Sequence, residues 1–380
     1  MKSISSYIKI IFTAGFIALS LIPGGCNLVD IPLNKLAASR DTTVDASIAK
    51  WYNNHSAAIS ITNDDSWGSD AQKEAQKFLI ENNMTMDYEV VTSEWEKDMQ
   101  SVHYFMDSLA ARGFGYYGHG HYHINHDELS YADDYKDFKT CYDTMKAFGM
   151  KPVAYAYPGG FGYHIATQNA LRDAGFLSAR MFEKLDFLDP FIVPGNEKEP
   201  KNWYQLPTLI MQSIDYDGCV ACINNTEDLI PYLDECIRQT AWIILSYHAI
   251  NNTSAFGYYF LPDMLKDFAA IHQRDFWVSS MNKITLYIRE RAQAKVSVSW
   301  IKNFYGEVDS IEINLEDNLP PDIYDQPLTV IFKLPSYWVN NNIDLLENNK
   351  TKQQFEFYTD KANVSLVPTN SVYYLVLGKN

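Results

Sequence analysis

Between about Ser56 and Ala294, short apolar runs alternate with longer amphipathic stretches, and this alternation constrains the fold more than any other feature. The short runs are typical of strands buried on both faces of a parallel sheet. They cover residues 57–62, 88–92, 113–117, 152–157, 178–182, 242–247 and 276–279. Helical periodicity covers residues 69–82, 97–112, 130–148, 164–174, 226–240 and 262–274. Strands that alternate with helices predict an α/β architecture, and about seven such units favour closure into a barrel.

The periodicity changes near residue 295. Val296, Val298 and Trp300 alternate with polar residues, and similar alternation recurs up to the end of the chain between Pro- and Asn-rich turns. Alternation with a period of two is typical of strands with one buried face. We therefore predict a barrel over residues 49–294 and a small antiparallel β-sandwich over residues 295–380.

The N-terminus has the layout of an export signal. Lys2 and Lys9 precede an apolar run over residues 10–22, and Pro-Gly-Gly-Cys follows this run at residues 23–26. A membrane-spanning helix needs about 20 apolar residues, so this run is better interpreted as a secretory signal peptide. Cys26 resembles the acceptor of a bacterial lipobox, with conventional cleavage nearby as the alternative. We expect a signal peptide over residues 1–26, a tether over residues 27–48, and an exported protein that a lipid holds in the cell envelope.

Composition excludes one class of partner. The chain has 47 acidic and 31 basic residues, a formal net charge of -16, so a nucleic-acid backbone would be repelled. Four cysteines remain besides Cys26, and in an oxidising compartment we expect them to form disulfides or buried thiols rather than a metal site. These are Cys141, Cys219, Cys222 and Cys236.

Titratable residues follow several of the predicted strands. Asp64 and Asp65 come at the carboxyl end of the first strand, which in a barrel is the catalytic face. Residues 118–126 hold four of the nine histidines, directly after another strand. His119 and His123 are four apart, a spacing that suits a metal ion. His121 and His126 offer other pairings.

Two further segments end on functional residue types. Residues 154–160 end a strand in a Pro-Gly-Gly turn, where the backbone can approach a ligand closely. Residues 243–248 form an apolar strand that delivers His248 at its carboxyl end. Either segment alone is equally compatible with a structural role.

Taken in this order, the segments resemble the motifs of the polysaccharide deacetylase family, whose catalytic region is the NodB homology domain, similar to carbohydrate esterase family 4. The resemblance covers about residues 49–292. Asp64-Asp65 matches the T-x-D-D motif and His119 to His123 the H-x-x-x-H motif. Residues 157–159 match part of the R-x-P-aromatic motif, and residues 245–248 match the closing L-x-x-H motif. The resemblance implies a distorted (β/α) barrel.

The resemblance also implies roles for individual residues. Asp64 would be the general base and His248 the general acid. Asp65, His119 and His123 would bind a divalent metal ion. We expect this ion to be zinc, with cobalt and nickel as alternatives. The backbone N–H of Gly159 would stabilise the oxyanion. Contacts to the glycan are expected from Tyr157, Pro158, Phe161 and Trp203.

The chain departs from the family pattern at two positions of the third motif. Ala156 stands where many members have the Arg that positions the catalytic Asp, and Gly159 stands where they have an aromatic residue. No fourth-motif Asp is recognisable to pair with such an Arg. We predict a metal-dependent hydrolase that removes N- or O-acetyl groups from a polysaccharide. The alternatives are a non-catalytic glycan-binding surface lipoprotein with the same fold, favoured by Ala156, and an adhesion protein that binds through its sandwich.

Overall fold

The computed structural model describes residues 40–64, 67–182, 189–213, 222–252, 257–348, 350–369 and 372–378. The predicted signal peptide, Cys26 and most of the predicted tether lie outside these ranges, and so does Asp65. Within them, no helix has the length and apolar character needed to cross a membrane.

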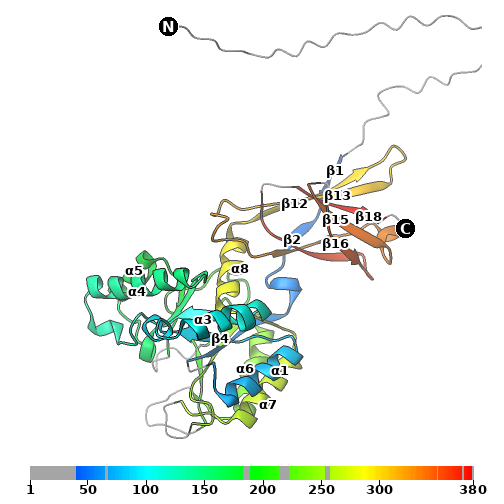
Figure 1. Cartoon of the computed structure of the whole chain (residues 1–380). Coiled ribbons are helices and arrows are strands. Elements are labelled where there is room, and N and C mark those ends of the chain that lie inside the picture. The colour runs from blue at the N-terminus through cyan, green and yellow to red at the C-terminus, as the bar shows by residue number, and fades with distance from the viewer. Residues whose placement is uncertain are drawn as a thin grey trace, which may run out of the picture.

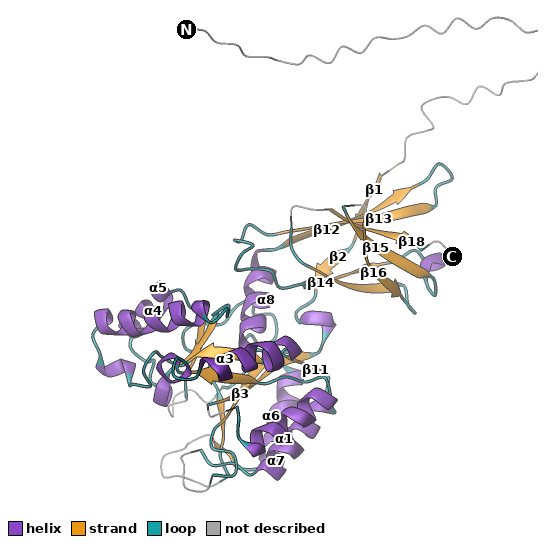
Figure 2. Cartoon of the chain, viewed as in Figure 1, coloured by secondary structure: helices purple, strands orange, loops and turns teal. Residues whose placement is uncertain are grey.

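The first large unit is a parallel sheet flanked by helices (Figures 1 and 2). Its strands run in the order β7-β6-β5-β4-β3-β10-β8-β9, and β11 pairs with β3. Each run predicted as a strand overlaps one of them. The strands are β3 (Ala57–Asn63), β4 (Asp87–Val90), β5 (Gly115–Gly118), β6 (Ala154–Ala156), β7 (Ser178–Arg180), β8 (Leu209–Met211), β9 (Cys222–Ile223), β10 (Trp242–Tyr247) and β11 (Phe276–Val278).

The segment over residues 203–206, which has no strand periodicity, joins the two ends of this sheet. The backbone of Ala179 in β7 donates to Trp203 at 2.8 Å, and that of Met181 donates to Leu206 at 3.1 Å. The same segment runs on into β8, which pairs with β10. The ring of strands is therefore nearly closed, and the prediction of a distorted (β/α) barrel is confirmed.

Helices cover the outside of the barrel. Ser69 and Ser130 cap α1 and α4 by accepting a hydrogen bond from the backbone three residues later, which explains where these helices begin. The stretch 97–112, predicted as one helix, breaks into α3, a π-helical turn (Phe105–Leu109) and a 3-10 turn (Ala110–Arg112). The α-helices are α1 (Asp70–Glu81), α2 (Thr92–Trp95), α3 (Met99–Tyr104), α4 (Tyr131–Ala147), α5 (Ile165–Ala174), α6 (Thr226–Arg238), α7 (Leu261–His272) and α8 (Met281–Gln293).

The second unit contains two antiparallel sheets, as predicted (Figure 2). One has the strand order β1-β12-β13-β18-β15-β16 and the other the order β17-β14-β2. The strands are β1 (Arg40–Val44), β2 (Ala46–Ile48), β12 (Lys295–Lys302), β13 (Val308–Glu316), β14 (Leu328–Lys333), β15 (Asn342–Glu347), β16 (Lys350–Glu356), β17 (Lys361–Leu366) and β18 (Val372–Leu377).

The predicted tether is wrong for residues 40–48. β1 pairs with β12, and β2 pairs with β14, so this stretch contributes strands to both sheets of the sandwich. These strands are short, and their alternation is too brief to stand out in the sequence. The chain therefore crosses the sandwich before it enters the barrel.

One apolar cluster is shared by barrel and sandwich. Trp51, Trp277 and Tyr287 on the barrel side belong to the same buried cluster as Leu328 and Val330 of β14. The hydroxyl of Tyr287 donates to the carbonyl of Ala49 at 2.9 Å, which ties α8 to the chain that leaves the sandwich. The sandwich thus covers an apolar face of the barrel.

We expect a chain that ends at Ala294 to lose stability and to aggregate, because the removal of β12 to β18 exposes this shared cluster to water. Thermal unfolding and size-exclusion chromatography of the truncated and full-length proteins measure the effect. A truncated protein that stays monomeric and melts at the full-length temperature would show that the barrel does not depend on the sandwich.

Candidate active site

Polar side chains gather where five barrel strands end. Asp64 follows β3, Glu89 lies in β4, His119 follows β5, Arg180 ends β7 and His248 follows β10. Since these strands are parallel, their carboxyl ends meet at one edge of the barrel, the position of the active site in barrel enzymes.

A buried ion pair forms the centre of this group. Nη2 of Arg180 donates to Oδ1 of Asp64, and the hydroxyl of Tyr117 donates to the same oxygen. Asp64 is 5% exposed and Arg180 is 1% exposed. The guanidinium carbon of Arg180 also lies 5.1 Å from the centre of the Tyr117 ring. A buried carboxylate with two donors is held in one orientation.

The electrostatics of this pair keep Asp64 ionised. Burial by itself raises the pKa of Asp64, but the opposing charge of Arg180, assisted by the hydrogen bonds from Arg180 and Tyr117, lowers that pKa to about 2. At neutral pH Asp64 is therefore a carboxylate, and it can accept a proton.

Arg180 supplies the guanidinium that the third motif lacks. Ala156 in β6 and Arg180 in β7 are direct partners in the register of the two strands. Ala156 is fully buried, so its small side chain leaves space beside the longer one. The third motif lacks the Arg at Ala156, but an Arg on the neighbouring strand, Arg180, forms an ion pair with Asp64.

The sequence reading missed both Arg180 and Tyr117. A usable signal was present, because Arg180 interrupts an apolar run that was predicted as a buried strand. A fully buried Arg is rare unless it is paired with an acid. Tyr117 carried no such signal, since an aromatic residue is ordinary in a buried strand.

His119 is held in one tautomer. Nδ1 lies 2.9 Å from the carbonyl oxygen of Ala156, and this oxygen can only accept, so Nδ1 carries the proton. Desolvation lowers the pKa of His119 to about 3, and the ring is neutral at physiological pH. Nε2 then presents a lone pair, as metal binding requires. The exposed ring of His123 lies beside it, with 4.9 Å between ring centres.

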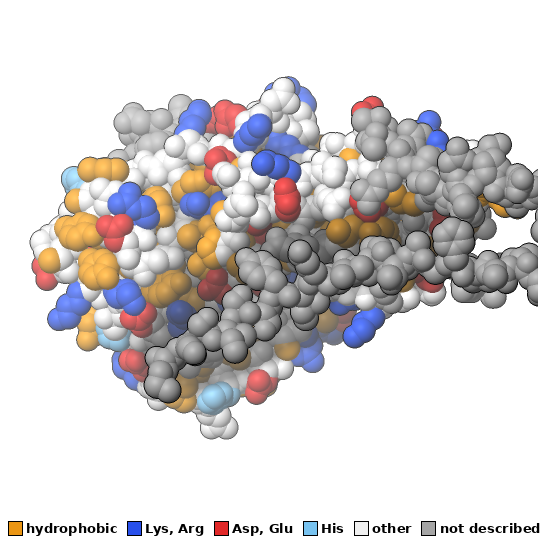
Figure 3. Space-filling view, turned by 90° about the horizontal axis from the view of Figure 1, so that it is seen from above, with side chains coloured by type: hydrophobic (Ala, Val, Ile, Leu, Met, Phe, Trp, Pro, Cys, Tyr) orange, Lys and Arg blue, Asp and Glu red, His pale blue; other side chains and the backbone are white. Residues whose placement is uncertain are grey.

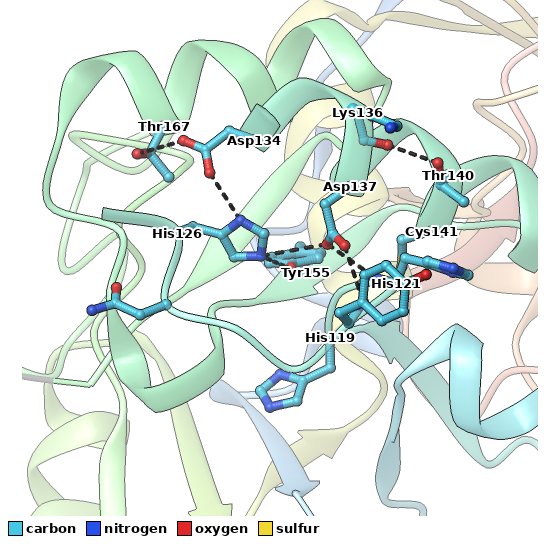
Figure 4. A network of polar contacts seen from close by, with 12 residues as sticks. His119, His121, His126, Asp134, Lys136, Asp137, Thr140, Cys141, Tyr155 and Thr167 are labelled. Atoms are coloured by element: carbon cyan, nitrogen blue, oxygen red, sulfur yellow. Dashed lines mark hydrogen bonds and ion pairs between the residues drawn. The ribbon is translucent and has the colours of Figure 1, made fainter. Parts of the chain in front are cut away.

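The other two histidines of the cluster have structural partners. His126 is fully buried, and its Nδ1 lies 2.9 Å from Oδ1 of Asp134 (Figure 4). The carboxylate of Asp137 accepts from the backbone N–H of His121 and of Tyr122, each at 3.0 Å. These contacts fix the loop that follows β5, with His119 at its beginning.

His121 contacts Thr92 through its side chain, with 3.0 Å between Nδ1 and the hydroxyl oxygen. Of the pairings left open by the sequence, the structure therefore brings His119 and His123 together and places His121 and His126 in other contacts.

His248 lies next to Asp64 in the strand register. Tyr247 and Asn63 are partners in the pairing of β10 with β3, and the backbone of Asp64 donates to the carbonyl of Tyr247 at 2.9 Å. Gly257 packs on His248 with φ +69°, and a Cβ on Gly257 would lie 2.7 Å from the Cβ of His248. His248 is half-buried at the strand edge where Asp64 lies.

The residues predicted to stabilise the oxyanion or to contact the glycan differ in exposure. Gly159, with φ +64°, is exposed, and the partly exposed ring of Phe161 lies over it. Tyr157 and Pro158 are buried, so their side chains support packing and do not face a glycan. Trp203 stacks on Arg289 of α8, with 4.3 Å between the guanidinium carbon and the ring centre.

The predicted metal site is only partly described. Within the described ranges, no three His, Cys, Asp or Glu side chains are grouped so as to hold an ion, and Asp65 is outside those ranges.

Cys141 and Cys236 are buried free thiols, and Cys222 is disulfide-bonded. On the face drawn in Figure 3, acidic and basic side chains are interspersed.

One family model matches part of the chain. Residues 52–179 match the family model for polysaccharide deacetylase. This segment therefore matches the NodB domain of the polysaccharide deacetylase family. No curated protein matches the chain in a sequence search.

Several solved structures are distantly similar to the chain. A candidate polysaccharide deacetylase from Mycobacterium smegmatis is 15% identical in sequence. The aligned region covers 66% of this chain and 95% of the other chain, with a TM-score of 0.46. The peptidoglycan deacetylase PdaC from Bacillus subtilis is 12% identical over 63% of this chain and 95% of its own, with a TM-score of 0.39. A carbohydrate esterase family 4 pseudoenzyme from Bacillus anthracis is 10% identical over 60% of this chain and 65% of its own, with a TM-score of 0.40.

Proposed function

We propose that the protein hydrolyses N- or O-acetyl groups on a polysaccharide with the help of one divalent metal ion. The observation that supports this most is the ionised, buried Asp64, held by Arg180 and Tyr117 at the catalytic edge of a deacetylase barrel. Burial of an ion pair is costly, and a protein that only binds glycans has no need of a carboxylate kept in this state.

The residues that would hold the ion are Asp65, His119 and His123. The donor chemistry at His119 fits a metal, because Nδ1 is committed to Ala156 and the Nε2 lone pair is available. A bound ion would polarise the acetyl carbonyl and lower the pKa of water at the site.

Asp64 would act as the general base. The bonds from Arg180 and Tyr117 both end on Oδ1, so Oδ2 would accept the proton of the attacking water. His248, at the next strand end, would protonate the departing amine or alkoxide. The backbone N–H of Gly159, in its exposed turn, would stabilise the negative charge that develops on the acetyl oxygen.

The alternative of a non-catalytic glycan-binding protein was favoured by Ala156. Arg180 weakens that argument, because the guanidinium is present at the same level of the barrel. We therefore prefer the enzyme.

Acetate release tests the proposal. We expect the protein loaded with zinc, cobalt or nickel to release acetate from at least one of a panel of acetylated glycans: peptidoglycan, chitin oligomers, acetylated xylan and an exopolysaccharide. Heat-denatured protein with the same metal is the control. Binding to a glycan without acetate release on any metal would favour the alternative.

A further inference from the structure

We propose that Asp267, a fully buried residue of α7, is a positioning residue for the proposed acid His248. It acts through two tyrosines, Tyr247 and Tyr259, whose hydroxyl groups it binds. The inference rests on the proposed function, in which His248 protonates the leaving group.

The carboxylate of Asp267 accepts three hydrogen bonds, all from hydroxyl groups. Oδ1 accepts from Thr226 at 2.6 Å. Oδ2 accepts from Tyr247 at 2.9 Å and from Tyr259 at 2.8 Å. Burial raises the pKa of Asp267 to about 6, against the opposing effect of these bonds, so the group is mostly ionised at neutral pH. An apolar side chain could fill the same space with less loss of stability. What the carboxylate adds is a fixed orientation for the hydroxyls bonded to it.

Tyr247 connects this carboxylate to both of the proposed proton-transfer groups. It is the last residue of β10 and directly precedes His248. Its carbonyl accepts the backbone N–H of Asp64 at 2.9 Å, and its hydroxyl donates to Asp267. Tyr247 is fully buried. The placement of the acid relative to the base therefore depends on one residue, whose side chain Asp267 holds.

Tyr259 fixes the segment that packs on His248. Gly257, two residues earlier, comes so close that an added Cβ would lie 2.7 Å from the Cβ of His248. The rings of Tyr247 and Tyr259 meet edge to face, with 5.3 Å between their centres. Both hydroxyls end on Oδ2 of Asp267. Chain segments that precede and follow His248 in the sequence are thus held by one carboxylate.

This arrangement predicts which substrates depend on Asp267. A general acid works only within hydrogen-bond reach of the leaving atom, and a misplacement of about 1 Å can cost about 10²-fold in rate. The amine or alkoxide of a sugar needs the proton, whereas 4-nitrophenolate is stable as an anion and leaves without it. Loss of Asp267 should therefore slow the hydrolysis of an acetylated glycan and spare that of 4-nitrophenyl acetate.

Steady-state kinetics of the full chain on both substrates test the inference. The variants are Asp267→Asn, His248→Ala and the double variant, with Tyr247→Phe as a second way to break the network. Asn is close to Asp in shape, so Asp267→Asn changes the bonds to the tyrosines with little change in volume. Asp263→Asn is the matched control, because Asp263 is a partly exposed acid one turn earlier in α7 that pairs with Lys266. Thermal unfolding of each variant is measured beside the rates.

We expect Asp267→Asn to lower kcat on the glycan by about 10- to 10²-fold, with KM unchanged, and to hydrolyse 4-nitrophenyl acetate at the wild-type rate. Tyr247→Phe should show the same pattern with a smaller loss, and Asp263→Asn should match the wild type. In the His248→Ala background, Asp267→Asn should have no further effect, because Asp267 acts only through His248.

An equal loss on both substrates would overturn the inference, because it would show that Asp267 only stabilises the barrel. A loss on the glycan that adds to that of His248→Ala would also overturn it, and so would an unchanged kcat. If Asp267→Asn does not fold, Tyr247→Phe decides by the same criteria. If His248→Ala keeps its full rate on the glycan, or the wild type releases no acetate from it, the proposed function itself fails, which is a distinct outcome.

Discussion

Replacement of Arg180 with Ala is expected to lower turnover on an acetylated glycan by about 10²- to 10⁴-fold, the usual scale of a lost general base. Arg180 does not contact the substrate in this account. It acts through Asp64, whose carboxylate it holds in the ionised state. The loss of one partner of a buried pair also costs about 3–5 kcal/mol of folding free energy, so unfolding must be measured beside the rate.

The pH profile separates this positioning role from a merely structural one. With Arg180 present, the pKa of Asp64 is about 2, below its ordinary value of 3.8. The contribution of the pair to stability is complete above the ordinary value and is lost as the pH falls through 2. In Arg180→Ala, the largest opposition to the effect of burial on the pKa of Asp64 is lost, and we expect the acid limb of kcat/KM to move to higher pH.

The shifted position of the guanidinium gives a sharper version of the same test. Because Ala156 and Arg180 are register partners, the double variant Ala156→Arg, Arg180→Ala returns the guanidinium to the strand where the family motif has it. We expect it to recover part of the lost turnover. Ala156→Arg alone should be poorly stable, since it buries a second cation in a filled site. Arg172→Ala, which removes an exposed Arg paired with Asp173 outside the site, is the control.

If Arg180→Ala keeps its turnover and its pH profile, Asp64 is not the base that Arg180 positions. A double variant no more active than Arg180→Ala, though folded, would show that the two strand positions are not equivalent.

Removal of the proposed metal ligand and removal of the proposed base should give different phenotypes. His119→Ala is expected to lose both the metal ion and all measurable acetate release, because the activation of water depends on the ion. Asp64→Asn should retain most of the metal and lose about 10²- to 10⁴-fold in turnover. Metal content by mass spectrometry, measured beside acetate release, distinguishes the two.

His121→Ala is the matched control within the same loop, since its side chain pairs with Thr92. The assignment of His119 is contradicted if His119→Ala keeps its metal and His121→Ala loses it. Equal metal content in every variant would remove the metal site altogether.

The barrel could be predicted from the sequence because its strands are short, apolar and separated by helices. The run at residues 242–247 agrees with β10 at both ends, because a strand buried on both faces is mostly apolar. β8 and β9 were missed, because β8 lies in an apolar run of only three residues and β9 has only two residues. β1 and β2 were assigned to a tether because their alternation is too brief to stand out.

The candidate site was predictable where sequence neighbours carry the chemistry. Asp64 and the pair His119 and His123 are adjacent in motifs, and the structure brings the two His rings together. Arg180 comes from a separate strand and meets its partner only through the strand register. A contact that depends on register has no local signal, so the partner of Arg180 could not be predicted, although an Arg within an apolar run indicates that Arg180 itself is paired.

The most direct test of the account is acetate release by the zinc-loaded protein on an acetylated glycan, measured for the wild type and Asp64→Asn in parallel. The account predicts release by the wild type and a rate about 10²- to 10⁴-fold lower for Asp64→Asn at equal zinc content. Equal rates for the two proteins, or no release by a zinc-loaded wild type that binds the glycan, would contradict it.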